Sequence, residues 1–277
     1  MSLESTKAVF VDDLTFKYPN SDSPSLQQVS LSVDWNTTNL IIGSNGAGKS
    51  TLLKILAGKR LCLNGKIFIN GVNPFSSKFR NEQEFGMNTC TYFGTEWCHQ
   101  EIINRDIGVL ELLDSLGYSQ HFKARGDLLI SILEIDVNWR MFKLSDGLKR
   151  RVQLVMGLLK PFKVLLLDEV TVDLDVVARC KLLDFLKNET KTRQCTIIYA
   201  THIFDGLNDW PNRVVHIHDG RIVDDHKYSD IEFVESSDSK AATAKTSATE
   251  NKLKVPKSNS LHPLALSWLL SDQKTAL

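Results

Sequence analysis

The segment from Gly43 to Thr51 places the strongest constraint on how this chain can fold. It reads Gly-Ser-Asn-Gly-Ala-Gly-Lys-Ser-Thr and fits the pattern GxxxxGK followed by Ser or Thr. Residues Asn39–Ile42 before it predict a strand, and Ser50–Leu56 after it predict a buried helix. A glycine loop in this setting binds phosphate, because backbone N–H groups and the helix N-terminus face the anion. The alternative, a glycine-rich turn with a chance lysine, does not explain why strand, loop and helix coincide.

The residue types of this loop have separate roles toward a nucleotide. We expect the Lys49 ammonium to reach the β and γ phosphates and the Ser50 hydroxyl to ligate Mg²⁺. The residues expected to contact the nucleotide are Gly43, Ser44, Asn45, Gly46, Ala47, Gly48, Lys49, Ser50 and Thr51.

A second pair of chemical groups follows the apolar run Val164–Leu167, which predicts a strand buried on both faces. Asp168 and Glu169 come directly after it, and ligands of open α/β sheets bind at the carboxyl ends of strands. We expect Asp168 to hold the Mg²⁺ shell and Glu169 to polarise an attacking water. A strand that ends in Asp-Glu is by itself a common change of polarity, and the upstream P-loop favours the catalytic interpretation.

Strands and helices alternate along the chain. Thr196–Ala200 predicts another buried strand, and Asp219-Gly220 predicts the turn of a hairpin. Phe75–Asn88 is polar and irregular, whereas apolar residues repeat at helical spacing from about Ile107 to Leu159. This order predicts an α/β domain with a helical insertion.

The composition of the 277 residues argues against several classes of protein. Lys plus Arg and Asp plus Glu both number 33, so the formal net charge is zero and no direct nucleic-acid binding is expected. No stretch approaches the roughly 20 apolar residues of a membrane span, and residues 1–7 do not resemble a signal peptide. The five scattered cysteines predict free thiols in a reducing compartment. We expect a soluble, cytoplasmic protein that inserts into no membrane.

The segment Leu144–Arg151 reads Leu-Ser-Asp-Gly-Leu-Lys-Arg-Arg. With the two motifs above, it resembles the LSGGQ signature of the ATP-binding cassette (ABC) family. Ser145 and Gly147 match, whereas Asp146 replaces a glycine and Leu148 replaces the glutamine. An aspartate near a γ-phosphate is unfavourable unless it points to solvent, which bears on turnover rather than on the fold. From its residue type alone, Ser145 is the N-cap of a basic helix.

The resemblance covers roughly residues 8–234 and implies a fold, a ligand and an assembly. The fold is α/β: a P-loop NTPase cassette (residues 1–234) with an N-terminal antiparallel β subdomain, a RecA-like core and a helical signature subdomain at about 95–160. The implied ligands are ATP and Mg²⁺, with ATP hydrolysed. The implied assembly is a homodimer with ATP at the interface, where Ser145 and Gly147 face the γ-phosphate held by the other subunit.

Further segments match the family in order. Tyr18 lies upstream of Gly43, where an aromatic ring stacks on adenine, and an ordinary strand tyrosine is the alternative. Val172–Asp175 resembles the D-loop, and His202 follows a predicted strand as the switch histidine does; a structural histidine is the alternative. The implied catalytic residues are Glu169, His202 and Lys49.

The glutamine of the family's Q-loop is not at its usual place. Thr95 occupies that position, with Glu96 and Gln100 as other candidates. In transporters this loop couples ATP to the membrane subunit, so its change weakens the transporter interpretation without excluding it.

Four stretches carry a narrower resemblance: Gly94–His99, Ile102–Leu113, Glu169–Asp175 and Asn259–Leu266. They are similar to soluble fungal ABC ATPases associated with the carbon-catabolite-repression–Not regulatory complex. This implies protein partners in a Not-type regulatory complex, a link to transcription or mRNA control, and a location in the nucleus as well as the cytoplasm.

Three functions are compatible with these features. The first is a soluble regulatory ATPase whose ATP-driven dimerisation is sensed by protein partners. The second is the ATPase subunit of a transporter that pairs with a separate membrane protein. The third is a nucleotide-binding scaffold with little hydrolysis, which Asp146 and Leu148 suggest. The residues retained for hydrolysis argue against it: Lys49, Asp168, Glu169 and His202.

The chain changes in composition after residue 234. Residues 235–258 are rich in Ser, Ala, Thr and Lys and predict a flexible linker. Residues 259–277 are apolar again and predict a short helix that starts near Pro263. We expect this tail to fold back onto the cassette, and docking on a partner is the alternative.

Overall fold

The computed structural model describes residues 6–81, 88–94, 105–204, 206–234, 245–246, 253–256 and 261–275. A central sheet has the strand order β5-β6-β7-β3-β8-β9. Its neighbours pair in parallel except β8 and β9, which form the predicted antiparallel hairpin. Its strands are β3 (Thr38–Ile42), β5 (Asn88–Phe93), β6 (Phe162–Asp168), β7 (Thr196–Ala200), β8 (Arg213–His218) and β9 (Arg221–Lys227).

The parallel strands are buried on both faces, as their continuous apolar sequences predict. In β6, the side chains of Val164 and Leu166 belong to one core cluster, and those of Leu165 and Leu167 to another. The first cluster includes α2 (Lys49–Leu56) and a smaller antiparallel sheet. That sheet has the order β2-β1-β4, with β1 at Val9–Phe16, β2 at Leu26–Val33 and β4 at Lys66–Ile69.

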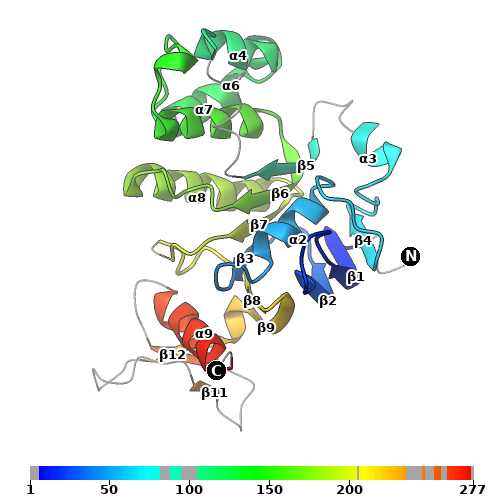
Figure 1. Cartoon of the computed structure of the whole chain (residues 1–277). Coiled ribbons are helices and arrows are strands. Elements are labelled where there is room, and N and C mark those ends of the chain that lie inside the picture. Colours follow the sequence, from blue (N-terminus) through cyan, green and yellow to red (C-terminus); the bar gives the residue numbers. More distant parts are fainter. Residues whose placement is uncertain are drawn as a thin grey trace.

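The second core cluster packs helices against the other face of the central sheet. Figure 1 shows α4, α6 and α7 together beyond the β5 edge, with α8 beside β6. The predicted helical region is described from residue 105 onward, and residues 95–104 lie outside the described part. Its helices are α4 (Val109–Ser115), α5 (Tyr118–His121), α6 (Lys123–Leu133) and α7 (Asp146–Leu159), followed after β6 by α8 (Val176–Thr192).

One short helix differs from the sequence prediction. The stretch Phe75–Asn88 was expected to be irregular, but Ser77–Asn81 forms helix α3. The Ser76 hydroxyl accepts a hydrogen bond from the Phe79 backbone N–H at 3.3 Å, and the Phe79 side chain packs against the first core cluster. This side-chain cap and the tertiary contact stabilise a turn that has no helical periodicity of its own.

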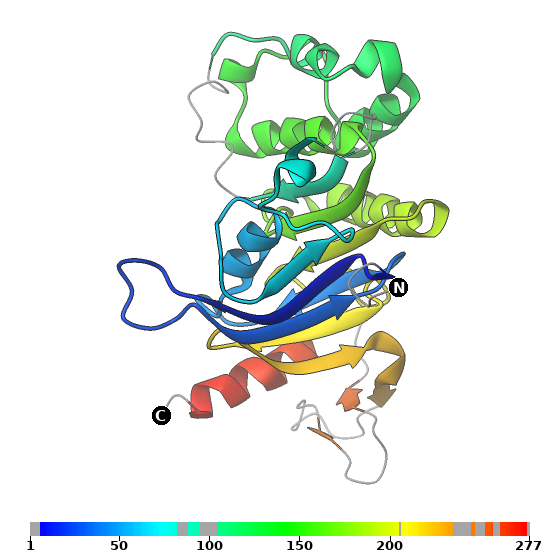
Figure 2. The ribbon, with the colours of Figure 1, turned by 90° about the vertical axis from the view of Figure 1, so that its right-hand side faces the viewer.

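The C-terminal segment packs against the cassette. Helix α9 (His262–Thr275) lies next to β8 and β9 (Figures 1 and 2). It buries Leu264, Ala265 and Trp268, and Leu261 just before it is buried too. The Trp268 ring stacks on the His216 imidazole of β8, with centroids 4.9 Å apart and planes 3° from parallel. Asp272 Oδ2 lies 3.1 Å from His216 Nε2. Stacking and polar contacts together attach the tail to the sheet.

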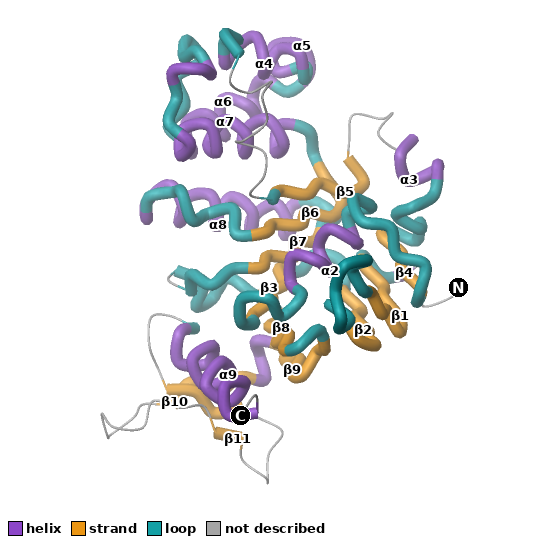
Figure 3. Tube along the Cα trace, viewed as in Figure 1, coloured by secondary structure: helices purple, strands orange, loops and turns teal. Residues whose placement is uncertain are grey.

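The stretch expected to be a flexible linker lies mostly outside the described residues. Two parts of it are described and differ from that expectation, because Lys245–Thr246 (β11) and Leu253–Pro256 (β12) form strands. β12 pairs in parallel with β10 (Ile231–Val234) and antiparallel with β11. Figure 3 shows the strands β10 and β11 near α9. The pairing with β10 supplies backbone partners that the polar composition does not reveal. Among the described helices, none has the length and apolar character needed to cross a membrane.

Candidate active site

The glycine loop joins β3 to α2 and wraps around a lysine side chain. Gly46 and Gly48 adopt φ values of +84° and +105°, a region that glycine enters without steric strain. The Lys49 ammonium donates hydrogen bonds to the carbonyl oxygens of Gly43 at 2.8 Å and Ser44 at 2.9 Å. The charge is therefore held at the loop, where a phosphate oxygen can replace a carbonyl as its partner.

Asp168 ends β6 beside the start of α2. Its Oδ1 accepts a hydrogen bond from the Ser50 hydroxyl at 2.9 Å, and its Oδ2 accepts one from the Tyr92 hydroxyl at 3.0 Å. Burial raises the pKa of Asp168, and these two hydrogen bonds oppose the shift. Burial likewise lowers the pKa of Lys49, while the Glu169 and Asp168 carboxylates oppose that shift.

The pair of Ser50 and Asp168 fits the requirements of Mg²⁺. This ion takes one or two protein oxygens and keeps water and phosphate oxygens as its other ligands. In the described part of the chain, no group of three or more His, Cys, Asp or Glu side chains forms a fuller protein cage. The donor set therefore suits a metal that arrives together with a nucleotide.

Glu169 lies directly beyond β6 in a strained backbone conformation. Its φ of +54° is uncommon for a non-glycine residue, and its backbone N–H donates to the Ala200 carbonyl at 2.9 Å. Its Oε2 lies 2.8 Å from His202 Nδ1 and accepts a hydrogen bond from the His202 backbone N–H at 3.3 Å. His202 follows β7, the strand between β6 and β3, so the sheet order places all three motifs at one edge.

A cavity of about 360 Å³ opens beside the glycine loop. Its lining combines Tyr18, Ser25, Glu169 and the loop residues 45–51. The Tyr18 hydroxyl lies 3.2 Å from Thr51 Oγ1, and the Arg60 guanidinium carbon lies 5.1 Å from the Tyr18 ring centroid. The structure thus brings Tyr18, the loop and Glu169 around one space.

A second cavity, of about 460 Å³, also borders the loop. Helix α9 contributes Leu269 and Asp272 to its wall, which sequence reasoning did not foresee. The other lining residues are Gly43, Ser44, Asn45, His202 and His218. The C-terminal helix therefore borders the phosphate-binding loop.

Ser145 and Gly147 are not brought to the glycine loop of the same chain. Ser145 caps α7, and its hydroxyl accepts a hydrogen bond from the Leu148 backbone N–H at 3.4 Å. Helix α7 belongs to the helical region, whereas α2 lies beside the central sheet (Figure 1). The Asp146 side chain is 71% exposed, with the Lys149 ammonium 3.7 Å away. Within one chain, the signature and the phosphate site are separate.

The region around β5 holds candidates that the structure does not describe and a contact that the sequence did not predict. The candidates for the Q-loop position, Thr95, Glu96 and Gln100, lie outside the described residues. Tyr92 contacts Asp168 but was not singled out from the sequence, because nothing in its neighbourhood marks a strand tyrosine as a partner of that carboxylate.

The strand–loop–helix, the carboxylate at the end of β6 and the residue after β7 define a P-loop nucleotide-binding cassette. The chain belongs to the ABC ATPase family: residues 26–172 match the family model described as ABC transporter. It is 56% identical over 277 residues to the Saccharomyces cerevisiae protein named CCR4-associated factor 16, with 96% of each chain covered. It is 42% identical over 228 residues to Arabidopsis thaliana ABC transporter I family member 20, covering 77% of this chain and 68% of that protein.

Solved structures confirm the predicted fold class. An ATP-binding subunit of an ABC transporter aligns with a TM-score of 0.65 and 24% identity, over 80% of this chain and 91% of that chain. The dimeric post-hydrolysis cassette MJ0796, bound to ADP and Pi, aligns with a TM-score of 0.65 and 19% identity, over 79% of this chain and 98% of that chain. At these identities the likeness establishes the fold alone.

Proposed function

We propose that this chain binds MgATP in the cavity beside the glycine loop and hydrolyses it. The observation that carries the proposal is the convergence at one sheet edge of Lys49, of Ser50 hydrogen-bonded to Asp168, and of Glu169 paired with His202. Membership of the ABC family supports it independently.

Each side chain has a task in this proposal. Lys49 exchanges its carbonyl partners for phosphate oxygens, and Ser50 and Asp168 hold the metal. When bound, Mg²⁺ neutralises charge that develops on the phosphates. Glu169 accepts a proton from the attacking water, and His202 fixes the orientation of the Glu169 carboxylate through two contacts.

We further propose that two copies close over the nucleotide. Ser145 and Gly147 do not reach the loop of their own chain, so a second copy would have to supply them to the γ-phosphate. The related fold of the dimeric cassette MJ0796 supports an arrangement of this kind. A capped helix N-terminus carries partial positive charge that suits a phosphate.

For the cellular role, we favour regulation through protein partners. The similarity to the protein named CCR4-associated factor 16 supports a link to a Not-type complex in transcription or mRNA control. Cytoplasmic and nuclear locations are part of this proposal. A transporter ATPase subunit is the second candidate, because other relatives are named ABC transporter family members.

Hydrolysis can be tested with the change Glu169→Gln. The amide keeps the shape of the side chain but cannot accept the proton, so turnover should fall at least about a hundredfold. Binding of a fluorescent ATP analogue should stay within about twofold. The control Lys49→Ala should lose both ATP binding and turnover, because it removes the ammonium from the phosphate site. Full turnover in Glu169→Gln would assign proton abstraction to another group.

A further inference from the structure

The Tyr92 hydroxyl reaches the metal-ligating carboxylate from a neighbouring strand. β5 lies beside β6 in parallel register, with Tyr92 opposite Leu166 and Phe93 opposite Leu167. From there the hydroxyl donates to Asp168 Oδ2 at 3.0 Å, while Ser50 donates to Oδ1 at 2.9 Å. Both carboxylate oxygens therefore have a hydrogen-bond donor, and the two donors come from different elements.

A glycine makes room for this contact. A Cβ atom on Gly94 would lie 2.5 Å from the Tyr92 hydroxyl oxygen and 2.9 Å from two ring carbons. Any larger residue at position 94 would therefore push the Tyr92 ring away from its place. The Arg150 guanidinium donates to the Gly94 carbonyl at 2.6 Å, which fixes the backbone at this point.

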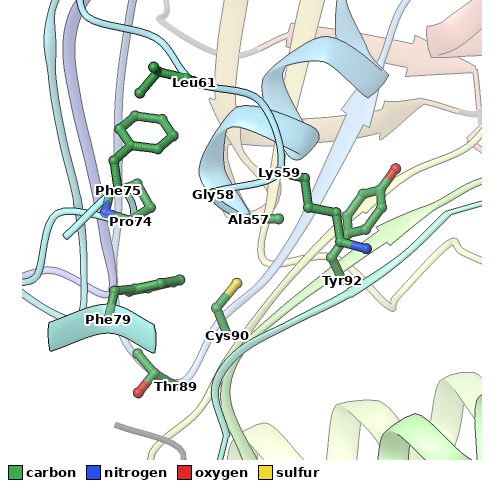
Figure 4. Close-up of a pocket in the computed structure, with 10 residues that line it drawn as sticks. All are labelled: Ala57, Gly58, Lys59, Leu61, Pro74, Phe75, Phe79, Thr89, Cys90 and Tyr92. Atoms are coloured by element: carbon green, nitrogen blue, oxygen red, sulfur yellow. The ribbon is translucent and has the colours of Figure 1, made fainter. Parts of the chain in front are cut away.

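The Tyr92 ring also forms one wall of a cavity of about 500 Å³ (Figure 4). The Lys59 ammonium lies 5.0 Å from the ring centroid, so the ring is held by a cation–π contact as well as by its hydroxyl. Cys90, two residues earlier on the same strand, lines this cavity too, and burial raises the pKa of its thiol to about 12. The ring is thus fixed on the cavity side and its hydroxyl on the Asp168 side.

We propose that Tyr92 is a positioning residue that holds the Asp168 carboxylate in the orientation that binds the metal of MgATP. This proposal rests on the metal site proposed above. Without the hydroxyl, Asp168 loses the hydrogen bond to Oδ2, keeps the one from Ser50 to Oδ1, and can rotate more freely about its side-chain bonds. A ligand that rotates must be ordered when the metal binds, which costs affinity. Gly94 supports this arrangement because its lack of a side chain leaves space for the Tyr92 ring.

The change Tyr92→Phe removes the hydroxyl and keeps the ring. We expect the affinity of the ATP-bound protein for Mn²⁺, used in place of Mg²⁺ and followed by electron paramagnetic resonance, to fall about tenfold, the size of one hydrogen bond to a charged group. ATP affinity measured in EDTA should not change. The matched control is Tyr228→Phe. The Tyr228 hydroxyl lies 3.3 Å from Asp209 Oδ1, away from the metal site, so its removal should leave Mn²⁺ affinity unchanged.

The change Gly94→Ala tests the same idea by displacement. It should weaken Mn²⁺ binding in the wild-type background and add little in the Tyr92→Phe background, since the contact is then already lost. Wild-type Mn²⁺ affinity in Tyr92→Phe would overturn the inference while leaving the proposed function intact. Failure of the unmodified protein to bind ATP with Mn²⁺ would overturn both. Thermal melting shows whether each variant is folded.

Discussion

Gly43 and Gly46 lie three positions apart in the same loop, and they are glycines for different reasons. A Cβ on Gly43 would overlap the Ile217 carbonyl oxygen of β8, so the loop can lie against the sheet only without a side chain. Gly46 has no atom within 4 Å of its Cβ position, but its φ is +84°. The first glycine is required by close approach and the second by backbone conformation.

This difference predicts unequal effects of the same substitution. Gly43→Ala should force the loop away from β8, lower the melting temperature and abolish ATP binding, because the backbone N–H groups no longer converge. Gly46→Ala should cost about 1 kcal/mol of stability through its positive φ and leave a folded protein with weakened ATP binding. Differential scanning fluorimetry with and without ATP measures both effects. Equal losses in the two variants would contradict this account of the loop.

At the residue scale, the sequence revealed groups whose neighbours in sequence form a motif. Lys49 and Ser50 belong to this group because they are part of the glycine-loop motif. Asp168 belongs to it because it follows an apolar strand. Tyr92 and Gly94 could not be found in this way. The contact of Tyr92 with Asp168, for which Gly94 leaves room, depends on β5 lying beside β6, and no local sequence pattern predicts that pairing.

At the scale of elements, a network of two arginines and one glutamate joins the helical region to α8. Arg125 of α6 donates from both terminal nitrogens to Glu189, at 3.0 Å and 2.7 Å, and Arg193 contacts the same carboxylate. Burial raises the pKa of Glu189, but the hydrogen bonds from the two arginines outweigh it, and the pKa is lowered overall. The charge on Glu189 therefore stabilises the packing of α6 against α8.

Because the pKa of Glu189 is lowered, the pH range in which its ion pairs stabilise the fold can be predicted. A lowered pKa gives stability that is present above the unfolded-state value of about 4.3 and is lost as pH falls through the folded-state value. Glu189→Gln should cost about 2 kcal/mol at pH 7, after allowance for partial solvent screening, because it leaves two arginines without their carboxylate. Urea unfolding at pH 7 and pH 5 should give the same difference from wild type, and the difference should shrink below about pH 4.

The exposed Asp184 on the same helix provides the control. Asp184→Asn should change the free energy of unfolding by less than about 0.5 kcal/mol at every pH. A Glu189→Gln effect that persists undiminished in acid would show that shape, not charge, joins the helices.

Helices and strands were predicted well from sequence where a hydrophobic pattern or a turn motif within the segment determines them. The hairpin of β8 and β9 follows from Asp219-Gly220, and the buried strands follow from continuous apolar runs. The short elements α3 and β12 were not predicted, because a side-chain cap and a strand partner outside the segment stabilise them.

At the scale of the whole molecule, the glycine loop and the signature segment lie apart in one chain. The phosphate loop borders the central sheet, and the capped end of α7 belongs to the helical region (Figure 1). Helix α9 lines a cavity beside the loop, so the C-terminal segment is part of the surface around the proposed nucleotide site. We propose that a second copy completes the site when MgATP is bound.

The molar mass of the Glu169→Gln variant in solution tests this claim most directly. Multi-angle light scattering should give the monomer mass without nucleotide and twice that mass with MgATP, because bound ATP that is not hydrolysed holds the two copies together. Adding Lys49→Ala to this variant should restore the monomer at every ATP concentration. A monomer mass for Glu169→Gln with ATP demonstrably bound would contradict the account.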